Sequence, residues 1–365
     1  MSQIRLMKPY VSFNEVEAEF RDVFDTGIFT RGRYVEELRA DIVRYTGSKH
    51  AFLATSATTA LWVCLKLLEI GPGDEVVVSD FSFPATANVV EDLGARPLFA
   101  DVSSQTYNMR PDALRSLLTE KTKAVIFVDA LGNPAGLHEI KDICREHGIP
   151  LIEDAACSIG SSEFGRPCGS VADLTCFSFH PRKLISSGEG GAITTDRDDW
   201  AEWLSVKLAH GARPTENGLD FVDYGYNFRL TELQAIMASK QLAKIDEIVD
   251  SRNAIREVYR AQLEPIGFVA QHAGNSVRHN VQSLVFSVPP TCNRDALVAG
   301  LRSEGVESTI GTYAMSATTY YANKYGTRND IAASLMTSTI TLPCYDNVDV
   351  ERVAAAIRHI TKHSG

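Results

Sequence analysis

The sequence lacks the features of membrane proteins, secreted proteins and general nucleic-acid binders. None of its apolar runs is long enough to span a bilayer, and residues 1–10 contain no apolar signal core. Acidic side chains outnumber basic ones by 46 to 36, which gives a net charge of −10. Because nucleic-acid phosphates attract basic surfaces, this charge argues against nucleic-acid binding, but it leaves room for one phosphorylated ligand in a local positive pocket.

Cysteine and histidine are present without the spacing that disulfides or metals require. The seven cysteines are scattered and odd in number, and none of them forms a Cys-x-x-Cys pair. The nine histidines show no metal-ligand spacing. We therefore expect a reduced, cytoplasmic protein with no disulfide framework and no metal.

Short apolar runs alternate with helical patterns from about Lys49 to Thr195. Strands are expected at 51–54, 75–79, 96–100, 124–128, 150–153, 175–179 and 191–194. Helical patterns lie between several of them, at 58–68, 86–92, 111–118 and 137–147. This alternation predicts an α/β domain with a large, mostly parallel, seven-stranded sheet covered by helices on both faces.

A different pattern begins near Thr231, which is a suitable N-cap for one long helix at 231–263. The other expected elements are a strand at 281–288 and helices at 15–25, 293–305 and 349–363. We predict a large domain at 1–243, which includes the N-terminal segment, and a smaller C-terminal α/β domain at 244–365.

Two charged residues stand where buried strands are expected to end. Asp154 closes the apolar run at 150–154, and open α/β sheets bind ligands at the carboxyl ends of their strands. The alternative is that Asp154 caps the next turn. Lys183 lies on a turn before a glycine-rich bend. A lone lysine is usually a solvated surface charge, but burial or a nearby cation makes lysine a nucleophile for carbonyl groups.

Three further segments fit either a structural role or a ligand. A hydroxyl-rich turn contains Ser56 and Thr58, which could cap a helix or present its N-terminus to an anion. Phe83, at a strand-to-helix junction, is either a core residue or a stacking surface for a flat ring. Asn227 and Arg229 precede the helix at Thr231 and either begin that helix or bind a ligand.

Together these groups meet the requirements of pyridoxal 5′-phosphate (PLP). This cofactor needs an amine for its aldehyde, a carboxylate for its ring nitrogen, a stacking face and a phosphate cup. Lys183 offers the amine, Asp154 the carboxylate and Phe83 the stacking face. Residues 56–58 and Ser178 offer the cup.

At this point the chain resembles the DegT/DnrJ/StrS family of PLP-dependent sugar aminotransferases over nearly its whole length. The most specific match is Phe-Ser-Phe-His-Pro-Arg-Lys at 177–183 with Gly-Glu-Gly-Gly at 188–191. Further matches lie at 30–35, 55–58, 71–76, 82–86, 153–156, 225–229 and 342–343. Lys183 argues against the branch of the family that carries histidine there and performs dehydration.

The resemblance implies the aspartate-aminotransferase fold (PLP fold type I) and a homodimer with shared active sites. Lys183 would form the Schiff base with PLP, and Asp154 would bind the ring nitrogen. The other cofactor contacts would be Ser56, Ala57, Thr58, Phe83, Cys157, Ser178 and the partner's Asn227. The substrate would lie beside Arg31, His180, Glu189 and Arg229.

Three positions depart from the family pattern. Ala57 stands where glycine is usual, which is tolerable if its φ is negative. Cys157 replaces a common glutamine or histidine, which puts a polar contact to the ring oxygen of the cofactor in doubt. Asp129 replaces a common histidine.

The resemblance predicts transamination from L-glutamate to a keto sugar attached to a nucleotide. His180 and Glu189 favour a 4-keto-6-deoxy sugar, because Glu189 reaches further into the site than the aspartate of members that act at C3. Two alternatives stay open. One is transamination of a keto-cyclitol, and the other is a PLP-binding regulator without turnover, although no DNA-binding segment is apparent.

Overall fold

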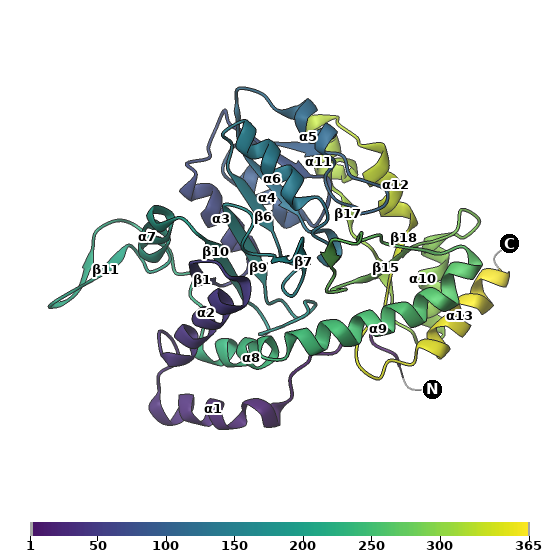
Figure 1. The fold of residues 1–365 in the computed structure, drawn as a ribbon, viewed down its shortest axis with the longest axis horizontal. Helices are drawn as coiled ribbons and strands as arrows, with labels where there is room; N and C mark the ends of the chain where they lie inside the picture. Colours follow the sequence, from purple (N-terminus) through teal and green to yellow (C-terminus); the bar gives the residue numbers. More distant parts are fainter. Residues whose placement is uncertain (1–2, 364–365) are drawn as a thin grey trace.

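A seven-stranded sheet forms the centre of the fold (Figure 1). In the computed structural model, which describes residues 3–363, the strand order is β1-β10-β9-β6-β5-β2-β4. The strands are β1 (His50–Ala54), β2 (Glu75–Ser79), β4 (Arg96–Ala100), β5 (Thr122–Val128), β6 (Leu151–Asp154), β9 (Leu174–Ser178) and β10 (Gly191–Thr195). Every strand lies within two residues of its predicted range, and the predicted fold class is confirmed.

The sheet is parallel except at one strand. β9, β6, β5, β2 and β4 pair in parallel, whereas β10 runs antiparallel to both of its neighbours, β1 and β9. Val76 and Val78 pack into the core on one face, and Val77 packs into the core on the other. Both faces are therefore buried, which explains why the strands read as continuous apolar runs.

Helices cover each face of this sheet. One core contains residues of α3 (Ala57–Leu67), α4 (Pro84–Asp92) and α7 (Asp198–Lys207). The opposite face is covered by α2 (Arg33–Thr46), α5 (Pro111–Leu117), α6 (Leu137–Glu146) and α8 (Glu232–Leu242). Because the parallel strands share one direction, their carboxyl ends meet at a single edge of the sheet.

A second core lies beyond the large sheet, around four short antiparallel strands. In sheet order these strands are β13 (Val269–Ala270), β15 (Leu284–Ser287), β18 (Thr339–Leu342) and β16 (Thr309–Ile310). The helices of this region are α9 (Ile245–Leu263), α10 (Arg294–Ser303) and α13 (Val350–His363). Ile4, near the N-terminus, forms a bridge with Val306 and joins the second core.

The prediction of one continuous helix at 231–263 is wrong. The structure has two helices, α8 and α9, and the backbone of Lys244 leaves the helical region at φ −118° and ψ 20°. Neither Ala243 nor Lys244 is a helix breaker, so the sequence offers no local reason for the break. At this point the Lys244 ammonium pairs with Glu15 of α1 (Phe13–Thr26), and the next residue, Ile245, is buried in the core. The domain boundary at Ala243 stays a prediction, and the break falls beside it.

A two-stranded arm extends away from the body of the molecule at the left of Figure 1. It consists of β11 (Ala212–Thr215) and β12 (Gly218–Phe221), and the side chains of Leu219 and Phe221 are more than half exposed. The shorter elements are β3 (Phe81–Ser82), β7 (Ser162–Glu163), β8 (Arg166–Pro167), β14 (Val277–Arg278), β17 (Tyr313–Ala314), α11 (Thr319–Tyr325) and α12 (Asp330–Ser338).

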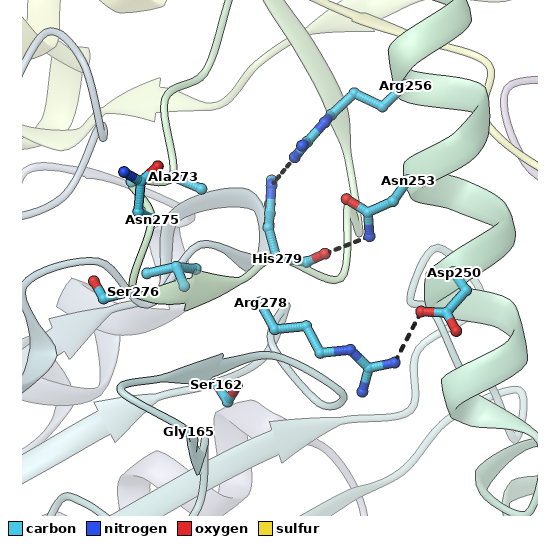
Figure 2. Close-up of a pocket in the computed structure, with 12 residues that line it drawn as sticks. Ser162, Gly165, Asp250, Asn253, Arg256, Ala273, Asn275, Ser276, Arg278 and His279 are labelled. Carbon is cyan, nitrogen blue, oxygen red and sulfur yellow. Dashed lines mark hydrogen bonds and ion pairs between the residues drawn. The ribbon is translucent and has the colours of Figure 1, made fainter.

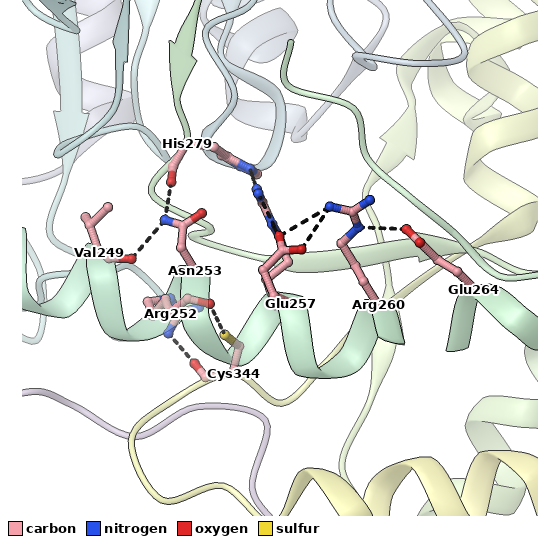
Figure 3. A network of polar contacts seen from close by, with 9 residues as sticks. Val249, Arg252, Asn253, Glu257, Arg260, Glu264, His279 and Cys344 are labelled. Atoms are coloured by element: carbon pink, nitrogen blue, oxygen red, sulfur yellow. Dashed lines mark hydrogen bonds and ion pairs between the residues drawn. The ribbon is translucent and has the colours of Figure 1, made fainter. Parts of the chain in front are cut away.

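A buried arginine ties α9 to the second core. Arg252 donates to the backbone oxygens of Val281 at 2.8 Å, Gln282 at 3.0 Å and Cys344, the last of which is visible in Figure 3. A buried guanidinium is tolerated when its donors meet acceptors in this way. Within residues 3–363, none of the helices combines the length and apolarity needed to cross a bilayer.

Candidate active site

A cavity of about 540 Å³ opens at the carboxyl edge of the large sheet. Ten of the thirteen predicted site residues line it: Ser56, Ala57, Thr58, Phe83, Asp154, Cys157, Ser178, His180, Lys183 and Glu189. The second region closes the opposite wall with residues that the sequence patterns did not indicate, among them Thr309, Gly311, Thr312 and Thr341. The cavity therefore lies between the two cores.

Asp154 and Lys183 are two of the charged residues that line this cavity. Asp154 ends β6 and accepts hydrogen bonds from Thr86 Oγ1 at 2.7 Å and from the backbone N–H of Ala156 at 3.3 Å. Burial raises the pKa of Asp154, while the bond from Thr86 and the positive charge of Lys183 act in the opposite direction. Lys183 Nζ donates to Cys157 Sγ at 3.0 Å. Thr86 was not predicted, and its position inside a helical pattern offered no signal.

The N-terminus of α3 forms a cradle suited to an anion. Ser56 is the N-cap and accepts from the backbone N–H of Thr59 at 3.1 Å, which leaves the N–H groups of Ala57 and Thr58 at the positive end of the helix. Ala57 is not among the residues with positive φ, so the condition for replacing glycine is met. A Cβ on Gly191 would lie 2.6 Å from the carbonyl carbon of Ser56, so glycine lets β10 approach this turn.

Phe83 presents an uncovered aromatic face to the same cavity. It is the N-cap residue of α4 and its side chain is 64% exposed. The ring of Tyr313, from the second region, lies 6.4 Å away and is tilted by 60°. Since an exposed phenylalanine at a cavity wall gains from covering its face, a flat heteroaromatic ring fits here.

His180 and Glu189 form a polar pair at the edge of the cavity. The imidazole Nε2 lies 4.0 Å from a carboxylate oxygen of Glu189. Burial lowers the pKa of His180, and the carboxylate of Glu189 partly offsets this effect. Both residues belong to the turn that carries Lys183, so they can contact a substrate bound beside the lysine.

Three predicted site residues lie outside this cavity. Asn227 and Arg31 are exposed, and the Nε of Arg229 is buried without a hydrogen-bond partner among the described residues. Burial and, secondly, the nearby guanidinium of Arg31 lower the pKa of Arg229. The neighbouring carboxylate, Glu232, accepts instead from the backbone N–H groups of Gly32 and Tyr34, at 2.8 and 2.9 Å. Among the described residues, neither Arg31 nor Arg229 forms an ion pair with a carboxylate, because the nearby Glu232 is held by backbone donors.

A second groove of about 620 Å³ lies between α9 and the segment at 273–279. None of the predicted site residues lines it. Figure 2 shows that its charged side chains already face partners: Arg278 lies 3.1 Å from Asp250, and Arg256 lies 3.4 Å from the ring of His279. These pairings make it a poorer candidate than the cavity at the sheet edge.

Residues 12–361 match the model of the DegT/DnrJ/EryC1/StrS aminotransferase family. The chain belongs to this family. It is 30% identical over 367 residues to GDP-perosamine synthase from Caulobacter vibrioides, covering 99% of each chain. It is 31% identical over 380 residues to UDP-4-amino-4-deoxy-L-arabinose–oxoglutarate aminotransferase from Shewanella sediminis, covering 97% of each.

A solved structure, the PLP form of Spr1654 from Streptococcus pneumoniae, superposes with a TM-score of 0.89 and 26% identity. The match covers 99% of this chain and 98% of that one. The family membership and the PLP fold type I that the sequence resemblance implied are thereby confirmed. The protein is accordingly an enzyme of the aminotransferase class.

Proposed function

We propose that this aminotransferase uses PLP to move an amino group from L-glutamate to a keto sugar attached to a nucleotide. The observation that carries the proposal is the convergence of an amine, a buried carboxylate, an open aromatic face and a helix N-terminus on one cavity. These are the four groups that PLP requires, and the cavity supplies them at separate walls. The names of the two curated relatives support a nucleotide sugar as acceptor and oxoglutarate as the product of the donor.

The residues of the cavity fit distinct tasks. When bound, PLP would withdraw electrons from the α-carbon of the amino donor. Lys183 would hold the aldehyde of the cofactor and, once released, carry the proton between the α-carbon and the cofactor. Asp154 would keep a proton on the ring nitrogen, because a carboxylate in contact stabilises the protonated form. Thr86 orients Asp154 through its 2.7 Å hydrogen bond.

The other polar groups of the cavity would hold the phosphate and the ring. Ala57, Thr58 and Ser178 surround the anion cradle, and Phe83 would cover one face of the ring. Cys157 stands beside Lys183, where a thiol makes only a weak hydrogen bond to the ring oxygen.

We further propose a homodimer in which the surface of Asn227, Arg31 and Arg229 completes the cavity of the partner subunit. Two features support this assembly. The two guanidinium groups find no counter-charge among the described residues of their own chain. Large apolar side chains are exposed on or near the same segments: Ile28, Phe29, Leu219, Phe221, Val222 and Tyr224. Exposed apolar patches of this kind favour association.

The acceptor is proposed to be a 4-keto-6-deoxy sugar. His180 and Glu189 lie together at the cavity edge. The glutamate side chain is longer than the aspartate that family members acting at C3 carry at this position. A longer carboxylate holds a different sugar hydroxyl and so presents a different carbonyl to the amine. Product analysis by NMR, with glutamate and a panel of matched 3-keto nucleotide sugars, 4-keto nucleotide sugars and keto-inositols, tests the proposal. Amination at C4 is expected, and amination of keto-inositols alone would overturn the acceptor class.

A further inference from the structure

Two buried carboxylates lie next in the chain to residues that line the cavity. Asp129 follows β5 and is fully buried, as is Glu153 in β6. One carboxylate oxygen of each and the sulfur of Cys168 lie within 4.8 Å of one another. Two negative charges this close, and out of contact with water, repel each other strongly and lose their hydration.

The hydrogen bonds around the pair leave one oxygen of each carboxylate open. Glu153 Oε2 accepts from Thr175 Oγ1 at 2.8 Å and from the N–H of Gly169 at 3.2 Å, and Asp129 Oδ2 accepts from Ser158 Oγ. Asp129 Oδ1 and Glu153 Oε1 have no donor among the described residues. Among residues 3–363, no lysine, arginine or histidine forms an ion pair with either carboxylate. The two open oxygens therefore have neither a donor nor a positively charged side chain as partner.

We infer that Asp129 and Glu153 share one proton, which bridges Asp129 Oδ1 and Glu153 Oε1 and forms a neutral acid with an ionised partner. A proton is the smallest cation that can satisfy two buried acceptors, and it needs no entry path through the core. This pairing lowers the combined negative charge of Asp129 and Glu153 from two to one. The inference concerns the folded chain itself and holds whether or not the proposed substrate is correct.

Asp129 is the member that carries the proton. Glu153 receives two hydrogen bonds that stabilise its charge, whereas Asp129 receives one. Burial, and then the negative charge of Glu153, raise the pKa of Asp129 well above its ordinary value. The other titratable groups that face the pair are Asp154 of β6, Cys168 before β9 and Cys176 of β9, none of which supplies a positive charge.

The pair supports the floor of the active site. Ala130 and Leu131, which follow Asp129 directly, line the cavity, and Glu153 precedes Asp154 in the strand. The backbone N–H of Asp129 donates to the carbonyl of Asp154 at 3.3 Å. Loss of the shared proton would place a second charge beside these residues and push the floor apart. The packing of the site is therefore pH-dependent.

The test counts the protons released on unfolding. The full-length protein is unfolded by denaturant at pH 6.5 in weak buffer with an indicator dye. In the unfolded chain both carboxylates are ionised, because their ordinary pKa values are about 4. The wild type should release one proton more per chain than Asp129→Asn, whose amide donates to Glu153 without titrating. Glu153→Gln should show the same deficit, and the surface control Asp199→Asn should match the wild type.

Three results would overturn the inference. Equal proton release from wild type, D129N and E153Q would show that no proton is shared. Elemental analysis that finds a stoichiometric metal ion, absent from D129N, would replace the proton by a cation held with Cys168. If neither variant folds, the infrared spectrum of the wild type decides, because a shared proton requires a band from a protonated carboxyl group at neutral pH and its absence contradicts the pair.

Discussion

Two surfaces of the chain differ in how many of their polar groups have hydrogen-bond or ion-pair partners. The inner wall of the cavity contains Ser56, Asp154 and Lys183, and the outer face contains Arg31, Asn227 and Arg229. On the inner wall, Asp154 has a donor at 2.7 Å, and Ser56 caps its helix. On the outer face, neither Arg31 nor Arg229 forms an ion pair with a carboxylate of the described residues. The polar groups of the inner wall therefore have partners within the chain, whereas these two guanidinium groups lack an acidic partner. The proposed dimer accounts for the difference.

The largest expected effect is on the inner wall. Lys183→Ala should lower the rate of the half-reaction with glutamate by at least about 10³-fold, since it removes both the cofactor attachment and the proton carrier. Stopped-flow absorbance of the cofactor measures this rate. Lys121→Ala, an exposed lysine outside the cavity, serves as the control. Near-normal turnover of K183A would contradict the proposed roles of Lys183 in cofactor attachment and proton transfer.

A smaller loss is expected at the carboxylate. Asp154→Asn should retain the fold, because Thr86 can still donate to the amide oxygen, but it should slow proton transfer by about 10²-fold. Circular dichroism checks the fold, and the kinetic isotope effect with α-deuterated glutamate reports the proton transfer. Wild-type rates in D154N would mean that another group protonates the ring nitrogen.

The outer face should respond differently from the inner wall. The double change Asn227→Asp and Arg229→Ala adds a negative charge and removes a positive one on the surface that is proposed to complete the partner subunit's PLP cavity. We expect weaker PLP binding by about tenfold or more, with the inner wall unchanged. Equilibrium dialysis of PLP measures the effect. Unaltered affinity would place these residues outside the cofactor site.

The smallest effects concern two buried aspartates and thermal stability. The Asp80 carboxylate accepts hydrogen bonds from the N–H and Oγ of Ser316 and from Asn329 Nδ2. In Asp80→Asn the new amide NH2 group would face one or more of these donors, which should lower the free energy of unfolding by about 1–3 kcal/mol. Asp129→Asn replaces the shared proton by an amide donor to Glu153, so its cost in the free energy of unfolding should be much smaller. Melting temperatures of the two variants at pH 7 compare them directly. A larger loss in D129N would contradict the open acceptor at Glu153.

The pH dependence of stability follows from the sign of the shift at Asp129. Its pKa is raised in the folded state, so the folded chain holds more protons than the unfolded chain above about pH 4. Stability should therefore fall as pH rises, by up to about 1.4 kcal/mol per pH unit in that window. Urea midpoints between pH 5 and 8 should decline more steeply in the wild type than in D129N. Parallel slopes would count against the shared proton.

Most of the inner wall was predictable because its determinants are local. Apolar runs of strand length give the seven strands, and a carboxylate or a small hydroxyl group at the end of such a run marks the ligand edge. The break at Lys244 has no local signal, and the contact that Lys244 makes there is with Glu15, which lies far away in sequence. Thr86 and Thr312 could not be identified for the same reason. The arm did carry a signal, since Asn217-Gly218 is a typical hairpin dipeptide.

The residue patterns alone did not indicate a site on the outer face, because an exposed arginine is an ordinary surface residue. Only the family resemblance pointed to Arg31, Asn227 and Arg229, and their proposed role depends on the partner subunit of the proposed dimer. The pairing of Asp129 with Glu153 likewise needed three dimensions, because 24 residues separate them, from 129 to 153, and neither motif hints at a contact.

Subunit complementation tests the central claim most directly, namely that each active site joins the inner wall of one chain to the outer face of another. Chains with Lys183→Ala and chains with Asn227→Asp and Arg229→Ala are unfolded, mixed in equal amounts and refolded together. Activity is assayed at a PLP concentration that fills the wild-type site but not the weakened site of the double variant, so that neither variant alone has much activity. Random pairing makes half of the dimers mixed, and one of their two sites has both surfaces intact. The mixture should therefore recover about a quarter of wild-type activity, whereas a mixture no more active than its components would contradict the shared site.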